Sequence, residues 1–436
     1  MATVHVVGAG LAGLSCALTL AESGVRVVVH EAAPAAGGRC RSFADAALGR
    51  MVDNGSHLML SGNRAVIRHL ERTGARDRMT ALHPAAFPFL DRATGQCWTL
   101  RPGGMWFLDP SRRVPGGGAL DHFAALRLLT APAGATVADV LRPGSPLYAR
   151  LWAPLAVAGL NGRPERVSAR LLGAILRETL LRGEAACRPL FAPDGLSAAL
   201  VTPALARLEA LGAEVRFNAR VEGPETADGR VTGFRSGGAA VAAGADDALV
   251  LAVPPRAAAR LLPGLTVPPP GPAIVNAHFR LDRPAALPGG LPFLGLIGGT
   301  AEWLFARGDV LSVTVSAADA LAERPAETVA AALWTDCAAV LGRPADAPVP
   351  PVRVVKERRA TFDQSPTGDA ARPPAATRLE NLVLAGDWTA TGLPATVEGA
   401  LRSGEAAALV LLGRRTTSSA RPGLFQGFTF PGRRHM

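Results

Sequence analysis

The 436-residue chain is poor in lysine and in tyrosine. Only one of its 46 basic residues is a lysine, Lys356, and Tyr148 is its one tyrosine. A nucleic-acid platform needs basic and aromatic side chains interleaved on one surface. The arginines here are scattered, so we predict no nucleic-acid partner. The formal charge of +10 is explained mostly by arginine-rich codon usage, and a basic face on a membrane stays open.

Cysteine is also scarce, and no two cysteines have metal-ligand or redox spacing. The five are odd in number, widely spaced and form no CxxC pair: Cys16, Cys40, Cys97, Cys187 and Cys337. This pattern predicts neither a disulfide framework nor a zinc site, so we expect no metal. A reducing cytoplasm fits these cysteines.

Long apolar runs are absent as well. No stretch reaches the roughly 18 apolar residues that a membrane span needs, and the N-terminus has no secretory signal pattern. With 48% hydrophobic and 19% charged residues, the composition is that of an ordinary globular protein. We therefore expect a cytoplasmic protein, able to rest peripherally on the inner face of the cell membrane.

The N-terminus carries a glycine-rich turn inside a βαβ pattern. Residues 3–7 read as a buried strand, residues 11–24 as a helix and residues 25–30 as a second strand. Between strand and helix, GAGLAG places Gly8, Gly10 and Gly13 in GxGxxG spacing. In that motif the first glycine allows the tight turn, the second lets a pyrophosphate approach, and the third lets helix and strand pack closely.

Glu31 follows the second strand, 18 residues after Gly13. A carboxylate there suits a ribose 2′-hydroxyl and repels a 2′-phosphate. The alternative is an ordinary glycine turn, but strand, turn, helix and acid occur here in the expected order. The fingerprint predicts a dinucleotide without separating FAD from NAD.

Residues 37–42, GGRCRS, place Gly38 and Arg39 just after the acid. This segment resembles the Gly-Gly-Arg signature of the superfamily of amine oxidases, protoporphyrinogen oxidases and phytoene desaturases. The resemblance implies FAD, with glycines against the phosphates and the arginine supplying charge near them. It also implies that Val221 contacts adenine through its backbone, although an ordinary strand valine is an equal alternative.

Near the C-terminus, LVLAGD (382–387) reads as a strand that ends in Gly386 and Asp387. The same resemblance implies that Asp387 binds the ribityl or phosphate end of FAD. Residues 392–400, GLPATVEGA, then open a helix whose first amides, around Thr396 and Val397, can face the flavin. A second GxGxxG after a strand is absent, so we expect an external electron donor.

A closer resemblance lies between these motifs. Several stretches are similar to the squalene-associated FAD-dependent desaturase family, whose recognised members are hydroxysqualene dehydroxylases: MVDNGSHLML (51–60), LWAPLAVAGLNGRPERVSARLLGAILRETL (151–180), RPLFAPDGLS (188–197), KERRATFDQSP (356–366) and LAGDWTATGLPATVEGALRSG (384–404). The family usually has glutamine where this chain has Ser56. The resemblance implies a lipophilic polyprenyl substrate: an allylic alcohol loses water, and hydride from reduced flavin quenches the cation.

Such chemistry needs an acid near the hydroxyl, and the resemblance points to Asp53 and His57. We expect Asp53, kept protonated by an apolar cavity, to supply the proton directly or through His57, and then to act as counter-charge. Alternatively Asp53 caps a type I′ turn at Asn54-Gly55, and His57 is a satisfied core histidine. Trp388 either lines the flavin pocket or packs behind it.

Two other functions remain open at this stage. One is a carotenoid-type desaturase or an amine oxidase, although an aromatic amine cage is poorly provided for by a single tyrosine and six tryptophans. The other is a non-catalytic FAD-binding assembly partner.

The predicted fold is α/β, with a Rossmann-like FAD-binding domain of the glutathione-reductase type interleaved with an α+β substrate domain. We assign residues 1–75, 190–260 and 352–412 to the FAD domain, 76–189 and 261–351 to the substrate domain, and 413–436 to a flexible tail. Residues 105–108, Met-Trp-Phe-Leu, are predicted as a membrane contact, with a buried strand as the alternative.

Overall fold

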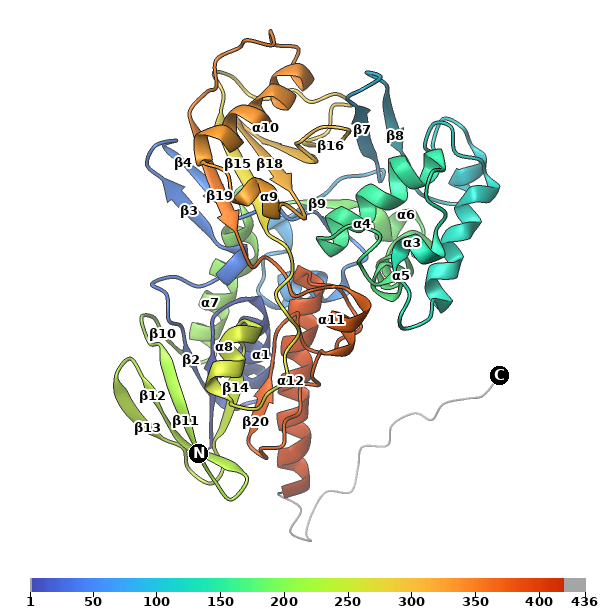
Figure 1. Ribbon diagram of the computed structural model, residues 1–436. Coiled ribbons are helices and arrows are strands. Elements are labelled where there is room, and N and C mark those ends of the chain that lie inside the picture. The colour runs from blue at the N-terminus through green and yellow to red at the C-terminus, as the bar shows by residue number, and fades with distance from the viewer. Residues whose placement is uncertain (1, 419–436) are drawn as a thin grey trace.

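The computed structural model describes residues 2–418 and has a parallel five-stranded sheet at its base (Figure 1). The strand order is β10-β2-β1-β14-β20. Their bounds are β1 Thr3–Val7, β2 Arg26–His30, β10 Glu214–Arg216, β14 Ala248–Leu251 and β20 Leu382–Leu384. Most of these strands are short valine- and leucine-rich runs, as expected of a parallel sheet that is covered on both faces.

Helices from both ends of the chain cover one face of this sheet. They are α1 Leu11–Glu22, α7 Thr202–Ala210 and α12 Val397–Ser418, with α2 Arg64–Arg72 beside α12. The approach of α12 to α1 is close because Gly404 has no side chain: a Cβ there would lie 2.2 Å from the Ala12 carbonyl oxygen. Ser15 also donates a hydrogen bond to the Leu401 carbonyl over 2.9 Å.

The opposite face is covered by a small antiparallel sheet and a short helix. These elements are β11 Val221–Ala227, β12 Arg230–Ser236, β13 Ala239–Ala242 and α8 Pro255–Leu261. Val221 and Phe234 pack there against Val7 and Leu251 of the central strands. The nucleotide-binding fold is therefore a three-layer unit, and the α/β prediction is confirmed.

A second, seven-stranded sheet lies above the first (Figure 1), in the order β19-β15-β18-β17-β16-β7-β8. Its strands are β7 Phe87–Asp91, β8 Cys97–Leu100, β15 Ile274–Arg280, β16 Phe293–Ile297, β17 Trp303–Arg307, β18 Val310–Val315 and β19 Val352–Glu357. One face packs its valines and leucines against α10 Ala326–Val340 and α9 Asp319–Ala322. The other face is turned toward the cofactor domain.

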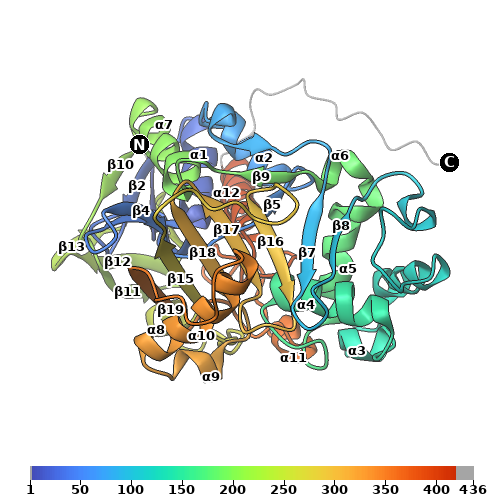
Figure 2. The ribbon, with the colours of Figure 1, turned by 90° about the horizontal axis from the view of Figure 1, so that it is seen from above.

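A helical region flanks this sheet and has its own apolar core. It contains two 3-10 segments, η3 Trp106–Leu108 and η4 Leu120–Thr130, a π-helical turn η5 Tyr148–Trp152, and α3 Val137–Val140, α4 Ala153–Leu160, α5 Ala169–Glu178 and α6 Glu184–Cys187. Seen from above (Figure 2), these segments lie at the edge of the molecule opposite β2 and β10.

Short elements join the two domains. They are η1 Gly38–Cys40, the hairpin β3 Ser42–Asp45 and β4 Arg50–Asp53, the small sheet of β5 Met59–Leu60, β9 Pro189–Phe191 and β6 Thr80–Ala81, and η2 Arg76–Arg78, η6 Leu180–Arg182, η7 Ser197–Val201 and α11 Pro366–Ala370. Within residues 2–418, no helix has both the length and the apolarity to cross a membrane.

Two predicted boundaries and one predicted strand need correction. Residues 352–357 form β19, which pairs with β15 of the upper sheet, so the third cofactor segment begins after this strand rather than at 352. The last helix continues to Ser418 instead of ending at 412. The rest of the predicted tail, 419–436, lies outside the described residues. Residues 106–108 are a 3-10 segment, so the buried-strand alternative for 105–108 is wrong.

Glu398 in the first turn of α12 caps the N-terminus of α2. Its carboxylate accepts hydrogen bonds from the amides of Ala65 and Val66 and from Arg402, and the residue is buried. No side chain of α2 itself caps this end. The negative charge of Glu398 lies at the N-termini of both α2 and α12, where the amide dipoles of each helix favour it.

We expect Glu398→Ala to lower the free energy of unfolding by about 1–3 kcal/mol, because buried amide donors lose their acceptor. Urea unfolding of the flavin-loaded protein would measure it. Glu405→Ala is the matched control: Glu405 lies on the same helix and binds Arg68 of α2 at the surface, where such a pair contributes about 1 kcal/mol or less. Equal losses for both variants would contradict the capping role.

Candidate flavin and substrate site

The glycine-rich turn between β1 and α1 contains two glycines that packing requires and one that it does not. At Gly8, φ is +105° and a Cβ would lie 2.4 Å from the Ala252 carbonyl oxygen. At Gly13, a Cβ would lie 1.9 Å from the Gly8 carbonyl oxygen. At Gly10 a Cβ would meet no atom within 4 Å. Gly10 therefore borders open space at the N-terminus of α1, where no side chain caps the helix.

Glu31 lies at the same edge of the sheet. Its carboxylate accepts hydrogen bonds from the amides of Ala9, at 2.7 Å, and Ala33, at 2.8 Å. The Glu31 carbonyl accepts from Ala219, which places Val221 two residues farther along the neighbouring segment. The predicted ribose and adenine residues are thus neighbours, although Val221 itself is buried against Val7 and Leu251.

The Gly-Gly-Arg segment lies directly against the glycine-rich turn. Gly37 donates a hydrogen bond to the Ala9 carbonyl over 2.8 Å, and Gly37 and Gly38 both have positive φ. Arg39 then reaches Asp387, whose two carboxylate oxygens lie 2.8 Å from its Nη2. The carboxylate beside it raises the pKa of Arg39. Residues from the two ends of the chain thus form one ion pair at this site.

A buried arginine that the sequence pattern did not reveal supports the Asp387 loop. Arg372 donates to the carbonyls of Asp387 and Thr389, and its guanidinium lies 4.7 Å from the ring centroid of Phe362. Burial lowers the pKa of Arg372. Gly386 has φ +146°, where a Cβ would lie 2.4 Å from Trp388 Nε1.

Three residues predicted near the flavin belong to this C-terminal segment: Trp388, Thr396 and Val397. Trp388 is buried and donates to the Val253 carbonyl, so it packs behind the site and does not line it. Thr396 Oγ1 accepts from the Gly399 amide over 3.0 Å, at the start of α12. Val397, the first residue of α12, is buried against the cofactor domain.

These features fit a bound dinucleotide. The space at Gly10, the uncapped amides of α1, the Glu31 carboxylate and the Arg39–Asp387 pair supply what phosphates and ribose hydroxyls need.

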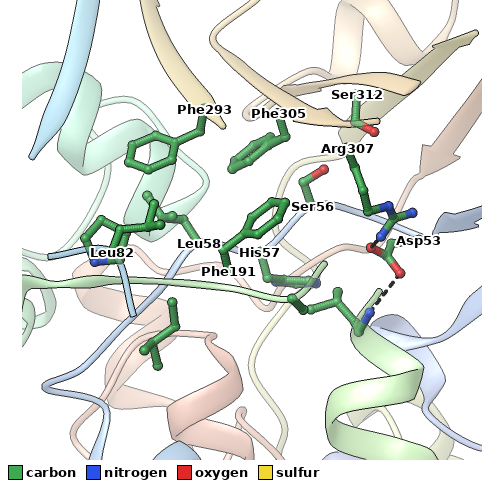
Figure 3. Close-up of a pocket in the computed structure, with 14 residues that line it drawn as sticks. Asp53, Ser56, His57, Leu58, Leu82, Phe191, Phe293, Phe305, Arg307 and Ser312 are labelled. Atoms are coloured by element: carbon green, nitrogen blue, oxygen red, sulfur yellow. Dashed lines mark hydrogen bonds and ion pairs between the residues drawn. The ribbon is translucent and has the colours of Figure 1, made fainter. Parts of the chain in front are cut away.

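A cavity lies between the cofactor domain and the upper sheet (Figure 3). One wall is formed by the segment that follows β4 and by β9. The other wall is formed by side chains of β16, β17 and β18. The lining residues are Asp53, Ser56, His57, Leu58, Leu82, Pro189, Leu190, Phe191, Ala192, Leu196, Phe293, Phe305, Arg307 and Ser312.

Asp53, at the end of β4, forms an ion pair with Arg307 across this cavity. Its Oδ2 lies 2.8 Å from Arg307 Nη1, and its Oδ1 accepts from Ser42 Oγ at 2.5 Å and from the Leu196 amide at 3.1 Å. The Asp53 carboxylate therefore has an ion-pair partner on one oxygen and two hydrogen-bond donors on the other. Neither Asn54 nor Gly55 has positive φ, so the alternative type I′ turn is wrong.

His57 projects into the cavity and is open to it (Figure 3). Surrounding protein lowers the pKa of His57, and Arg39 lowers it further. His57 is therefore not the satisfied core histidine of the alternative reading. The structure brings it together with Asp53 and with Ser56, the position at which this chain departs from the family pattern.

The sheet wall has a polar half and an aromatic half. Arg307 of β17 and Ser312 of β18 form the polar half, and Ser312 Oγ lies 2.8 Å from Nδ1 of the buried His278 on the neighbouring strand β15. Burial lowers the pKa of His278 to about 4. Aromatic rings fill the other half: Phe293 lies 6.5 Å from Phe305 between ring centroids.

Sequence reasoning missed this wall, above all Arg307, Phe293 and Phe305. Alternation along β17 was the available signal, because Trp303, Phe305 and Arg307 share one face while Leu304 and Ala306 share the other. Nothing in the sequence says which face meets the cofactor domain.

Comparison with known proteins decides the family. Residues 11–412 match the family model for flavin containing amine oxidoreductases. A hydroxysqualene dehydroxylase of Rhodopseudomonas palustris is 48% identical over 415 residues, covering 94% of this chain and 98% of the relative. The chain belongs to the hydroxysqualene dehydroxylase family.

Other comparisons agree with this membership. A hydroxysqualene dehydroxylase of Sinorhizobium fredii is 46% identical, with 95% of this chain and 99% of the relative covered. Among solved structures, cyclohexylamine oxidase from Brevibacterium oxydans has a TM-score of 0.70 at 17% identity and covers 95% and 99% of the two chains. That likeness concerns the fold alone. As a hydroxysqualene dehydroxylase family member, the protein is a flavin-dependent oxidoreductase.

Proposed function

We propose that this protein uses FAD to reduce hydroxysqualene, or a polyprenyl alcohol like it, to the corresponding hydrocarbon. One observation carries the proposal: a cavity with a charged end and an aromatic wall lies beside the residues that fit a dinucleotide. The charged end suits a hydroxyl group, and the aromatic wall suits an isoprenoid chain. FAD is supported by Glu31 and by the paired motifs at both chain ends.

The side chains divide the work of the reaction. Protonation of the allylic hydroxyl breaks the C–O bond, releases water and leaves an allylic cation. Ser56 and His57 border the position where a hydroxyl can be bound, and the aromatic residues exclude water that would recapture the cation. Reduced flavin, when bound, supplies the hydride that completes the reduction.

Asp53 acts in this proposal as a fixed negative charge. Its contacts with Arg307, Ser42 and Leu196 favour counter-charge over the acid role. The proton then comes from His57, the remaining acid on the cavity wall whose side chain is open to the cavity. Phe293 and Phe305 line the cavity, and an aromatic ring stabilises a cation that lies over its face.

The electrons come from outside the chain. One glycine-rich dinucleotide turn is accounted for by FAD, so we propose an external donor that reduces the flavin. We also propose that the reaction takes place on the cytoplasmic side, where the five free cysteines stay reduced.

Single-turnover reduction of hydroxysqualene tests the proposal. Photoreduced protein mixed anaerobically with hydroxysqualene should be reoxidised, and the lipid extract should contain squalene in proportion to the flavin. A desaturase would instead reduce its oxidised flavin with a polyene, and an amine oxidase with an amine. Flavin that hydroxysqualene does not reoxidise and that neither a polyene nor an amine reduces would leave only the non-catalytic binding role.

The pH dependence of this turnover reports on His57. Because the pKa of His57 is lowered, its acidic form is populated only below the usual range of histidine and disappears as the pH rises through that lowered value. We expect the rate of flavin reoxidation to rise toward acid pH and then level off. His57→Gln should flatten the profile, whereas His83→Gln, at an exposed site, should preserve it. An unchanged profile in His57→Gln would assign the proton elsewhere.

A further inference from the structure

Four large apolar side chains are exposed together at the outer edge of the helical region. The exposed fractions are 64% for Met105, 51% for Leu108, 47% for Phe123 and 44% for Leu126. Met105 directly precedes η3, Leu108 is the last residue of η3, and Phe123 and Leu126 belong to η4. In 3-10 geometry residues three apart lie on the same face, so each pair points in one direction. We call these four residues the apolar patch.

The two 3-10 segments lie against one another through aromatic contacts. The ring centroids of Phe107 and Phe123 are 5.1 Å apart, and those of Trp106 and His122 are 4.9 Å apart. Trp106 and His122 are buried, in contrast to the apolar patch. The exposed side chains therefore stand on a packed base, and their exposure is not the result of a missing core.

An apolar path leads from this base to the cavity. Trp106 and Trp98 share one core with Phe89, and Phe89 stacks on Trp98 at 5.6 Å. Phe89 in turn lies 5.6 Å from Trp303, and Trp303 lies 6.4 Å from Phe293 of the cavity wall. Ring contacts therefore run from Trp98 to the cavity wall, and Trp106 beneath the patch belongs to the same apolar core as Trp98.

The segment that carries the patch is basic. Residues 101–130 contain four arginines, Arg101, Arg112, Arg113 and Arg127, and two aspartates, Asp109 and Asp121, so the formal charge is 4 − 2 = +2. Both views place this segment at the outer edge of the molecule, far from the nucleotide-binding sheet (Figures 1 and 2).

We propose that the apolar patch rests on an anionic lipid bilayer and receives the polyprenyl substrate from it. The inference rests on the proposed function for the substrate and extends it to the route of entry. Exposed methionine, leucine and phenylalanine flanked by arginines suit the interface of an anionic membrane, where the apolar groups enter and the cations stay at the headgroups. The aromatic path distinguishes this surface from a plain protein-docking site.

Vesicle flotation tests the surface directly. Wild-type protein with bound flavin should float with vesicles of phosphatidylcholine mixed with phosphatidylglycerol, and less with phosphatidylcholine alone or at high salt. The double variant Phe123→Glu/Leu126→Glu should bind at least about tenfold more weakly, because two apolar anchors become charged. Leu409→Glu, at a 62% exposed position on α12, is the matched control and should float like wild type.

Two further measurements separate the possible failures. The double variant should turn over detergent-dispersed hydroxysqualene normally but vesicle-embedded hydroxysqualene at least about tenfold more slowly. Absence of turnover in every format, with flotation intact, would remove the proposed function and leave the membrane surface standing. Double-variant flotation equal to wild type would overturn the proposal. So would a patch-dependent dimer in sedimentation without vesicles, because the patch would then bind a second copy.

Discussion

Gly10→Val is expected to yield protein that folds but carries no flavin. The backbone φ of Gly10 is −73°, which valine tolerates, and a Cβ at this position meets no protein atom within 4 Å. The added side chain projects instead into the space that the phosphates of a dinucleotide need. We expect flavin absorbance after purification to fall below detection while the far-ultraviolet circular dichroism stays that of the wild type.

Valine substitutions at two other glycines are the controls for this experiment. Gly134→Val places the same side chain in a loop where a Cβ also meets nothing, and should keep its flavin. Gly13→Val should fail to fold, because its Cβ would overlap the Gly8 carbonyl oxygen. Full flavin occupancy in Gly10→Val would show that the dinucleotide binds elsewhere.

Asp53→Asn is expected to retain flavin and to lose about 10²–10³-fold in the rate of flavin reoxidation by hydroxysqualene. The substitution leaves the Arg307 guanidinium at the cavity without its counter-charge. A developing allylic cation then faces an uncompensated positive charge. The double variant Asp53→Asn/Arg307→Gln should recover part of the loss, since both charges are gone; a general acid at position 53 predicts no such recovery.

A neighbouring ion pair serves as the control for this experiment. Arg50 at the start of β4 pairs with Asp309, in the turn between β17 and β18, over 2.8 Å. Asp309→Asn breaks a contact between the same two domains without placing a charge at the cavity. It should keep near-normal turnover. A comparable loss in Asp309→Asn would mean that Asp53 serves mainly to hold the domains together.

The cofactor side of the site was predictable from sequence because local rules govern it. Gly13 is required by its contact with the Gly8 carbonyl inside a single βαβ unit, Gly8 by the positive φ of the turn in that unit, and the place of Glu31 follows from the length of the unit. Arg39 and Asp387 were both expected near the phosphates from separate motifs. Their direct pairing was not foreseen, because no local pattern reports a contact between residues 348 positions apart.

The substrate side was less predictable because its residues take their meaning from packing. Arg307 is the last residue of β17, and the sequence does not say which face of this strand meets the neighbouring domain. The ion pair of Arg307 with Asp53, seen in the structure, is what changes the role assigned to Asp53 from acid to counter-charge. Residues 120–129 look helical from the sequence alone, but their pattern does not distinguish 3-10 from α geometry, and the 3-10 geometry places Phe123 and Leu126 on one face. The sequence pattern places the last helix at residues 396–412, but the helix continues to Ser418 because its pattern fades before its hydrogen bonds do.

The Arg39–Asp387 pair and the β14–β20 pairing also constrain how the protein is made. During synthesis the ribosome releases β1, α1 and β2 long before Leu382–Leu384 can complete the sheet. At roughly 5–20 residues per second, the 348 positions between the two charges take about 17–70 s to translate. Throughout that interval the nascent N-terminal segment lacks strand β20 at the sheet edge and the α12 face that packs against α1, so apolar side chains of α1 stay uncovered. If Asp387 binds the cofactor as proposed, we expect cofactor loading to follow translation, and a premature stop codon anywhere before Asp387 removes the acidic partner of Arg39.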